Sequence, residues 1–143
     1  MTATTTLTAP APRPTSDRAT TKQIRRTGTF AGLAAAVATS TTAAVASAFD
    51  ISLEVGGKAI PVIGFAQLTF VAAIIGTVMA VVMSHRARRP RPTFVTSTIA
   101  LTALSILPDV AADGRTATKL VLALTHVVAA SILIPALASR LTD

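Results

Sequence analysis

Mostly apolar stretches, each about as long as a membrane helix, alternate along this chain with short segments that carry nearly all of its charge. The four stretches are residues 29–49, 60–83, 93–108 and 117–139. An α-helix of about 18 or more apolar residues spans the ~30 Å hydrocarbon layer of a bilayer. The pattern therefore predicts an all-α fold, a four-helix transmembrane bundle.

Composition agrees with a membrane protein and excludes several kinds of catalytic centre. Of the 143 residues, 51% are hydrophobic and 13% are charged, about half the ~25% charge of a soluble domain. The chain has no cysteine, which excludes disulfides, thiolate nucleophiles, iron–sulfur clusters and thiolate zinc sites. Its two histidines argue against a multi-histidine metal site within one chain. We therefore expect no cofactor and no metal ion.

The segment before the first stretch, residues 1–27, is rich in Thr, Pro, Ala and Arg. Such a segment buries too little apolar area to offset its ordering entropy, so we predict a disordered cytoplasmic tail. A transmembrane domain then covers residues 28–141. A signal peptide is an alternative for the first stretch, because Arg25-Arg26 precede it and Ala46-Ser47-Ala48 resemble a cleavage site. The tail and the apolar run are both long for a signal peptide.

Small residues recur at every fourth position in the first two predicted helices. These stripes are Gly28, Gly32 and Ala36 in the first helix, and Ala72, Gly76 and Ala80 in the second. Small residues four apart let two membrane helices approach closely. We therefore expect the two stripes to pack against each other.

Two prolines affect the later helices. Proline has no amide hydrogen and clashes with the preceding turn of a helix. Pro108 is therefore expected to limit the far end of the third helix. Pro135, inside the fourth, should leave the Ser131 carbonyl without its helical partner.

The basic residues are distributed asymmetrically between the connecting segments. Ten of the thirteen lie before the first stretch, between the second and third, or after the fourth. The connector between the second and third stretches holds Arg86, Arg88, Arg89 and Arg91. The positive-inside rule then places both termini and this connector in the cytoplasm. The four arginines are expected to determine topology, and they are also candidates for binding anionic lipid headgroups.

The net charge of +7 is explained by this topology rather than by nucleic acid. Binding of nucleic acid needs a basic face on a soluble domain, with aromatic residues for stacking, and neither is evident. The expected partner is the lipid bilayer, together with further copies of the chain or a larger membrane complex. The expected location is the cell membrane, the inner membrane of a bacterium.

Polar side chains inside the predicted helices are candidates for function, because they are expensive in a bilayer. His126 lies about 15 Å into the fourth helix at 1.5 Å per residue. Lys119 lies seven residues earlier on the same face, and the third helix has a polar stripe from Thr98 to Asp109. We predict an outward-opening polar crevice lined by His126, Asp109, Gln67, Ser105, Thr102 and Lys119.

The same residues also have a structural interpretation. Ser and Thr in membrane helices often bond their own backbone, and an interhelical hydrogen bond contributes only ~0.6 kcal/mol on average. His126 is then an interhelical contact, and Asp109 a helix cap or a solvated end. No catalytic set is complete, because Ser105 and Asp109 lie on a different helix from His126 at an unknown register.

Several short motifs resemble a known family. They are Gly57, Ala59-Ile60-Pro61, Gly64-Phe65, Leu107-Pro108-Asp109, Leu124-Thr125-His126, Ala129-Ala130 and Pro135. Over residues 25–141 the chain resembles an uncharacterised actinobacterial family of small four-helix integral membrane proteins, a domain of unknown function of the 6069 type. The resemblance implies no established activity, cofactor or partner.

Three classes of function follow from these patterns. The first is a non-enzymatic accessory or oligomeric component of the cell envelope, indicated by the low polarity and the two small-residue stripes. The second is binding or transport of a small molecule through the crevice around His126. The third is a membrane-embedded enzyme with His126 as general base, which requires an acid or a nucleophile within hydrogen-bond reach.

Overall fold

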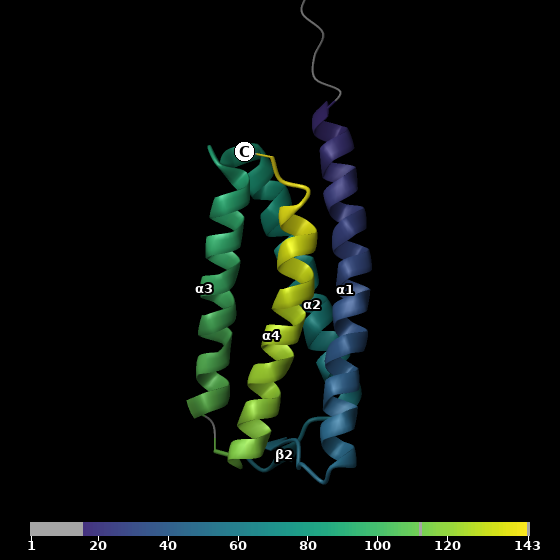
Figure 1. The fold of residues 1–143 in the computed structure, drawn as a ribbon, viewed down its shortest axis with the longest axis vertical. Coiled ribbons are helices and arrows are strands. Elements are labelled where there is room, and N and C mark those ends of the chain that lie inside the picture. Colours follow the sequence, from purple (N-terminus) through teal and green to yellow (C-terminus); the bar gives the residue numbers. More distant parts are fainter. Residues whose placement is uncertain (1–15, 112, 143) are drawn as a thin grey trace, which may run out of the picture.

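The computed structural model describes residues 16–111 and 113–142, with side chains from Thr20 onward. Its helices are α1 (Ser16–Ala48), α2 (Val62–Arg86), α3 (Pro90–Ala111) and α4 (Thr116–Ala138). A short hairpin, β1 (Glu54–Val55) and β2 (Lys58–Ala59), follows α1 (Figure 1). All four helices are long and apolar enough to cross a membrane, which confirms the predicted four-helix fold.

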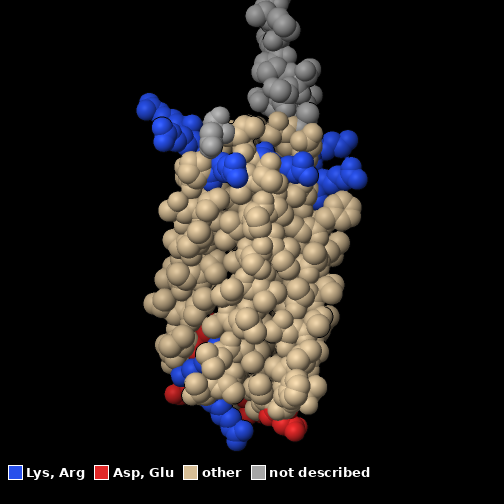
Figure 2. Space-filling model, viewed as in Figure 1, with Lys and Arg blue, Asp and Glu red and all other residues tan. Residues whose placement is uncertain are grey.

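The two ends of the bundle differ in charge. Figure 2 shows Lys and Arg gathered at the end where α1 begins, and acidic residues at the opposite end beside a few basic ones. We call the first the arginine end, defined by Arg25 and Arg26 on α1, Arg140 and the connector from α2 to α3. The other is the hairpin end, where β1 and β2 lie (Figure 1).

The start of α1 corrects the predicted disordered tail, because the helix already includes residues 16–27. Ile24 explains this extension, since it is fully buried in a cluster with Ala80, Phe94 and Leu137. Burying an isoleucine stabilises the fold by about 1.5–3 kcal/mol, which favours a helix before the bilayer. The part of the predicted tail in residues 1–15 lies outside the described residues.

The small residues of α1 face α2. A Cβ atom built on Gly32 would lie 2.8 Å from the Ala73 Cβ, and one built on Gly28 would clash with the Thr77 side chain. Ala36 is buried as well. One turn further along, the Thr39 and Thr69 hydroxyl oxygens lie 3.0 Å apart and share a hydrogen bond. The backbones of α1 and α2 therefore approach closely along this stripe.

The partner of this stripe differs from the prediction. On α2, Ala73 and Thr77 face α1, and Ala80 is fully buried beside Ile24. Ala72 and Gly76 instead face α3 and α4, where they line a cavity. The reason is that α2 packs against all three other helices, and adjacent helical positions are rotated by about 100°. The small residues of α2 thus serve two faces.

Pro108 does not end α3, which continues to Ala111. A proline so close to the helix end removes one backbone hydrogen bond, to the Leu104 carbonyl, and disturbs no later turn. The Lys119 Nζ donates to the Val110 carbonyl over 2.9 Å, so a cation from α4 partners the end of α3. Cations are favourable at this end of a helix.

A structured connector closes the hairpin end. Asp50 has φ 55° and follows α1, where the Ile51 amide donates to the Ala46 carbonyl over 3.1 Å. This arrangement is a Schellman motif, which satisfies carbonyls at a helix end. The hairpin turns at Gly56 and Gly57, both with positive φ. Thr118 of α4 fixes the connector by donating to the Ser52 carbonyl over 2.6 Å.

Candidate functional site

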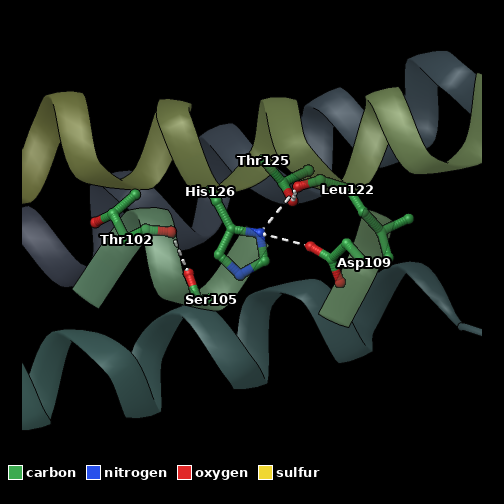
Figure 3. A network of polar contacts seen from close by, with 6 residues as sticks. All are labelled: Thr102, Ser105, Asp109, Leu122, Thr125 and His126. Atoms are coloured by element: carbon green, nitrogen blue, oxygen red, sulfur yellow. Dashed lines mark hydrogen bonds and ion pairs between the residues drawn. The ribbon is translucent and has the colours of Figure 1, made fainter. Parts of the chain in front are cut away.

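His126 occupies the centre of a polar cluster between α4 and α3 (Figure 3). Its Nδ1 atom lies 3.0 Å from the Leu122 carbonyl oxygen and 3.2 Å from the Asp109 Oδ2 atom. Leu122 lies one turn earlier on α4, and Asp109 lies in the last turn of α3. The side chain of His126 is therefore positioned by its own helix and by a neighbouring one.

This geometry assigns roles to the two ring nitrogens. A carbonyl oxygen only accepts hydrogen bonds, so the Nδ1 atom carries a hydrogen and donates to Leu122. In the neutral imidazole, the Nε2 atom then has a free lone pair and accepts. The hydrogen is directed at Leu122, and Asp109 Oδ2 is buried without a hydrogen-bond partner among the described residues. Asp109 thus contributes its charge to the site rather than a second hydrogen bond.

The hydroxyl groups near His126 already donate their hydrogens to backbone carbonyls. Thr102 donates to the Thr98 carbonyl over 2.8 Å, and Ser105 to the Thr102 carbonyl over 2.8 Å (Figure 3). Thr98, which lines the cavity further from His126, donates to the Phe94 carbonyl over 2.7 Å. Such bonds to the preceding turn are common for hydroxyls in membrane helices. These oxygens therefore offer lone pairs to their surroundings, but no hydrogen.

A cavity of about 330 Å³ lies beside His126, between α2, α3 and α4. On α3 its lining runs from Phe94 to Ser105, and on α4 from His126 to Leu137. Each run covers twelve residues, and the eleven steps between its ends span about 16 Å along a helix. Ala72 and Gly76 of α2 leave space opposite Ala129 and Ala130 of α4. The cavity is consequently elongated along the bundle.

The cavity is mostly polar at one end and mostly apolar at the other, where Thr98 contributes a hydroxyl whose hydrogen goes to the backbone. His126, Ser105 and Thr102 lie toward the hairpin end of the bundle. Phe94 and Leu137, each 1% exposed, close the cavity toward the arginine end. This distribution follows from the sequence of α3 and α4, which run in opposite directions with their polar positions at the same depth.

The structure gathers part of the predicted crevice and separates the rest. His126, Asp109, Ser105 and Thr102 lie together, as the spacing on α3 indicated. Lys119 instead caps the end of α3. Gln67 is exposed on α2 and does not line the cavity, because it is rotated by about 140° from Ala72.

Sequence reasoning missed the residues that create the volume. In the sequence, Ala72 and Gly76 indicate helix packing, and the Ala129-Ala130 pair only contributes to the family resemblance. The sequence does hold a signal for the cavity. Small residues lie at similar depth in two helices, and they leave space between these helices when a third helix keeps the two apart.

The chemistry of the cluster is that of a polar anchor in an apolar pocket. Among the described residues, no group of three His, Asp or Glu side chains is placed to hold a metal ion. Histidine accompanied by a carboxylate is suited to hydrogen bonding or proton transfer. The Ser105 hydroxyl donates to its own backbone rather than to His126, so it is not arranged as an activated nucleophile.

Comparison with known proteins identifies a family for this chain. The family model described as "Family of unknown function (DUF6069)" matches residues 19–143, which include all four transmembrane segments. The resemblance to a domain of unknown function of the 6069 type is thereby confirmed. No curated protein matches the chain, and no solved structure does.

Proposed function

We propose, for a chain that belongs to the DUF6069 family of unknown function, a role as a binding protein for a small, mostly apolar molecule. The four apolar helices indicate a multi-pass membrane protein. Within that class, the protein acts without catalysis, as an accessory component of the cell envelope. Its binding site is the cavity between α2, α3 and α4.

The observation that supports this proposal is the contact of an oriented histidine with a cavity. Ligand pockets typically have about 300–1,000 Å³, mostly apolar walls and a few positioned polar groups. The cavity has about 330 Å³ and is lined by His126, whose Nε2 atom accepts hydrogen bonds when the ring is neutral. A histidine serving only as an interhelical contact would pack against its neighbours without such a space.

Binding is favoured over catalysis by the state of the neighbouring groups. A general base must reach the proton that it removes, within about 2.6–3.2 Å. The Ser105 and Thr102 hydrogens point to backbone carbonyls. Asp109 contacts the Nδ1 side of the ring, which leaves the Nε2 side for a ligand.

We also propose that the arginine end faces the cytoplasm. Figure 2 places most basic side chains at this end, which is the distribution that the positive-inside rule associates with the cytoplasmic side. Arg86, Arg88, Arg89 and Arg91 are exposed and lie where anionic headgroups of the inner leaflet would be. The cell membrane and further copies of the chain are proposed partners in this arrangement.

Xenon is a suitable probe of the cavity, because it enters apolar cavities without needing a polar partner. Protein labelled with ¹⁵N-histidine has signals from two imidazole rings, those of His126 and of His85 at the arginine end. We expect xenon pressure to shift the His126 signal and to leave His85 unchanged. Gly76→Leu should abolish the shift by filling the cavity, whereas Gln67→Leu, on the exposed face, should not.

The proposal would be overturned by a wild-type His126 signal that does not respond to xenon. It would also be overturned by an equal response in the Gly76→Leu protein, since the gas would then occupy another place.

A further inference from the structure

The cavity differs chemically from one end to the other, and this difference defines its occupant. We propose that it binds a single-chain amphiphile with an uncharged hydroxyl headgroup, placed at His126 with its chain toward Phe94 and Leu137. This inference rests on the proposed binding function and adds the class of ligand and its orientation.

The polar end selects a headgroup that donates a hydrogen bond. The His126 Nδ1 hydrogen is directed to the Leu122 carbonyl, and the Ser105 hydrogen to the Thr102 carbonyl. With the imidazole neutral, the Nε2 atom and the hydroxyl oxygens therefore remain as acceptors. A ligand with acceptors alone would leave its own polar atoms and those of the site unpaired, which is costly in a desolvated pocket.

The charge of Asp109 further restricts which headgroups the cavity can bind. The Asp109 carboxylate lies next to the imidazole, so an anionic headgroup in the cavity would be repelled. In Figure 3, Asp109 lies on the Nδ1 side of the ring, and its Oδ2 atom is buried. A cationic headgroup at Nε2 would be separated from this carboxylate by the ring and would still lose its hydration. An uncharged hydroxyl is not repelled by the carboxylate and does not lose the hydration of a charge.

The opposite end accepts an apolar chain. Phe94 and Leu137 belong to the buried cluster at the arginine end and present only hydrocarbon to the cavity. The cavity extends ~16 Å between its two ends and is narrow, because α2, α3 and α4 surround it along their axes. An extended alkyl chain fits such a space better than a compact ring does.

The mouth of the cavity opens toward lipid rather than toward water. Ile75 of α2 and Leu101 of α3 line the cavity and are 59% and 50% exposed. Both lie in the middle of their helices, at the depth of the hydrocarbon layer. A ligand would therefore enter sideways from the bilayer, where a single-chain amphiphile is already dissolved.

The test compares four twelve-carbon probes that differ only in their headgroup: 1-dodecanol, dodecylammonium, dodecanoate and n-dodecane. Each is titrated over the same range of mole fractions into nanodiscs of zwitterionic lipid that hold the ¹⁵N-histidine protein. The shift of the His126 signal reports occupancy, and His85 is the internal reference. We expect saturation by dodecanol at about one tenth of the mole fraction needed by the other probes, the factor that one hydrogen bond supplies.

The outcomes separate this inference from the proposed function. Equal saturation by all four probes, abolished by Gly76→Leu, would overturn the hydroxyl preference while cavity binding stands. A preference for dodecanoate would show a charged imidazole and would overturn it as well. If no probe shifts His126 although xenon does, the cavity is real but not built for amphiphiles. If xenon also fails, both proposals fall.

Discussion

The Nδ1 atom of His126 lies 3.2 Å from the Oδ2 atom of Asp109 and joins α4 to α3 at the polar end of the cavity. The two residues are at different distances from the connector between their helices. They meet because side chains lean toward the start of their own helix, and these helices are antiparallel. The Asp109 side chain leans toward the arginine end, where α3 begins, and the His126 side chain leans toward the hairpin end, where α4 begins.

The side chains of Asp109 and His126 should be energetically coupled. Asp109→Ala and His126→Ala should each destabilise the protein, and the double variant should lose less than the sum. We expect a coupling free energy of about 0.5–2 kcal/mol, the range of interhelical polar contacts in membranes. Unfolding of detergent-solubilised protein, followed by circular dichroism, measures it. Additive effects would show that the two groups do not interact. Asp113→Ala combined with His126→Ala is the control and should be additive.

Gly32 and Gly76, one from each predicted stripe, should respond differently to alanine. At Gly32 the new Cβ would lie 2.8 Å from the Ala73 Cβ, so Gly32→Ala should cost about 1–3 kcal/mol through overpacking. At Gly76 the nearest atom is Leu137 Cδ1 at 3.8 Å, an ordinary contact. Gly76→Ala should therefore be neutral or stabilise the helix by up to about 1 kcal/mol. Thermal unfolding of both proteins in one detergent compares them, and equal losses would contradict this assignment of faces.

Lys119 should hold the end of α3 in place. Lys119→Met keeps most of the aliphatic stem but removes the donor to the Val110 carbonyl. A cation at a helix C-terminus contributes about 0.3–1 kcal/mol, so amide exchange at Asp109–Ala111 should accelerate about two- to fivefold. Hydrogen exchange with mass spectrometry measures this change. Lys58→Met in the hairpin is the control, and the same acceleration there would refute the local effect.

The left-handed conformation of Asp50 predicts the response to substitutions at this position. With φ 55°, Asp50→Gly should raise the free energy of unfolding by up to about 1 kcal/mol, because glycine adopts this region without steric cost. Asp50→Val should lower it by about 1 kcal/mol or more. Asp50→Asn should change it little, since asparagine also tolerates this conformation. A loss in both the Gly and Asn proteins would indicate that the carboxylate, rather than the backbone, is what matters.

The proposed orientation can be tested with cysteine labelling, because the chain has no cysteine of its own. Lys58→Cys lies in the hairpin and Thr142→Cys lies at the arginine end, and both positions are exposed. In intact cells, a membrane-impermeant maleimide should label the first variant and not the second. After permeabilisation both should react. Labelling of Thr142→Cys in intact cells would show that the orientation is the opposite one.

Some helix boundaries were predictable and others were not. The apolar stretches located every helix boundary to within about three residues, except the start of α1. Ile24 extends α1 through burial against α4 and α2, and such a contact between distant segments has no local signal. The end of α3 is extended past Pro108, where Lys119 provides a partner from the next helix.

By itself, the sequence determined the number of membrane helices, the separation of charge between the two ends and the polar face of α3. These properties depend on hydropathy and on helical periodicity, which are local along the chain. Tertiary structure alone decided that Ala72 and Gly76 line a cavity while Ala73 and Thr77 meet α1. It also decided that Asp109 and His126 meet. Both results depend on how each helix is rotated against its neighbours, and packing of the whole bundle sets that rotation.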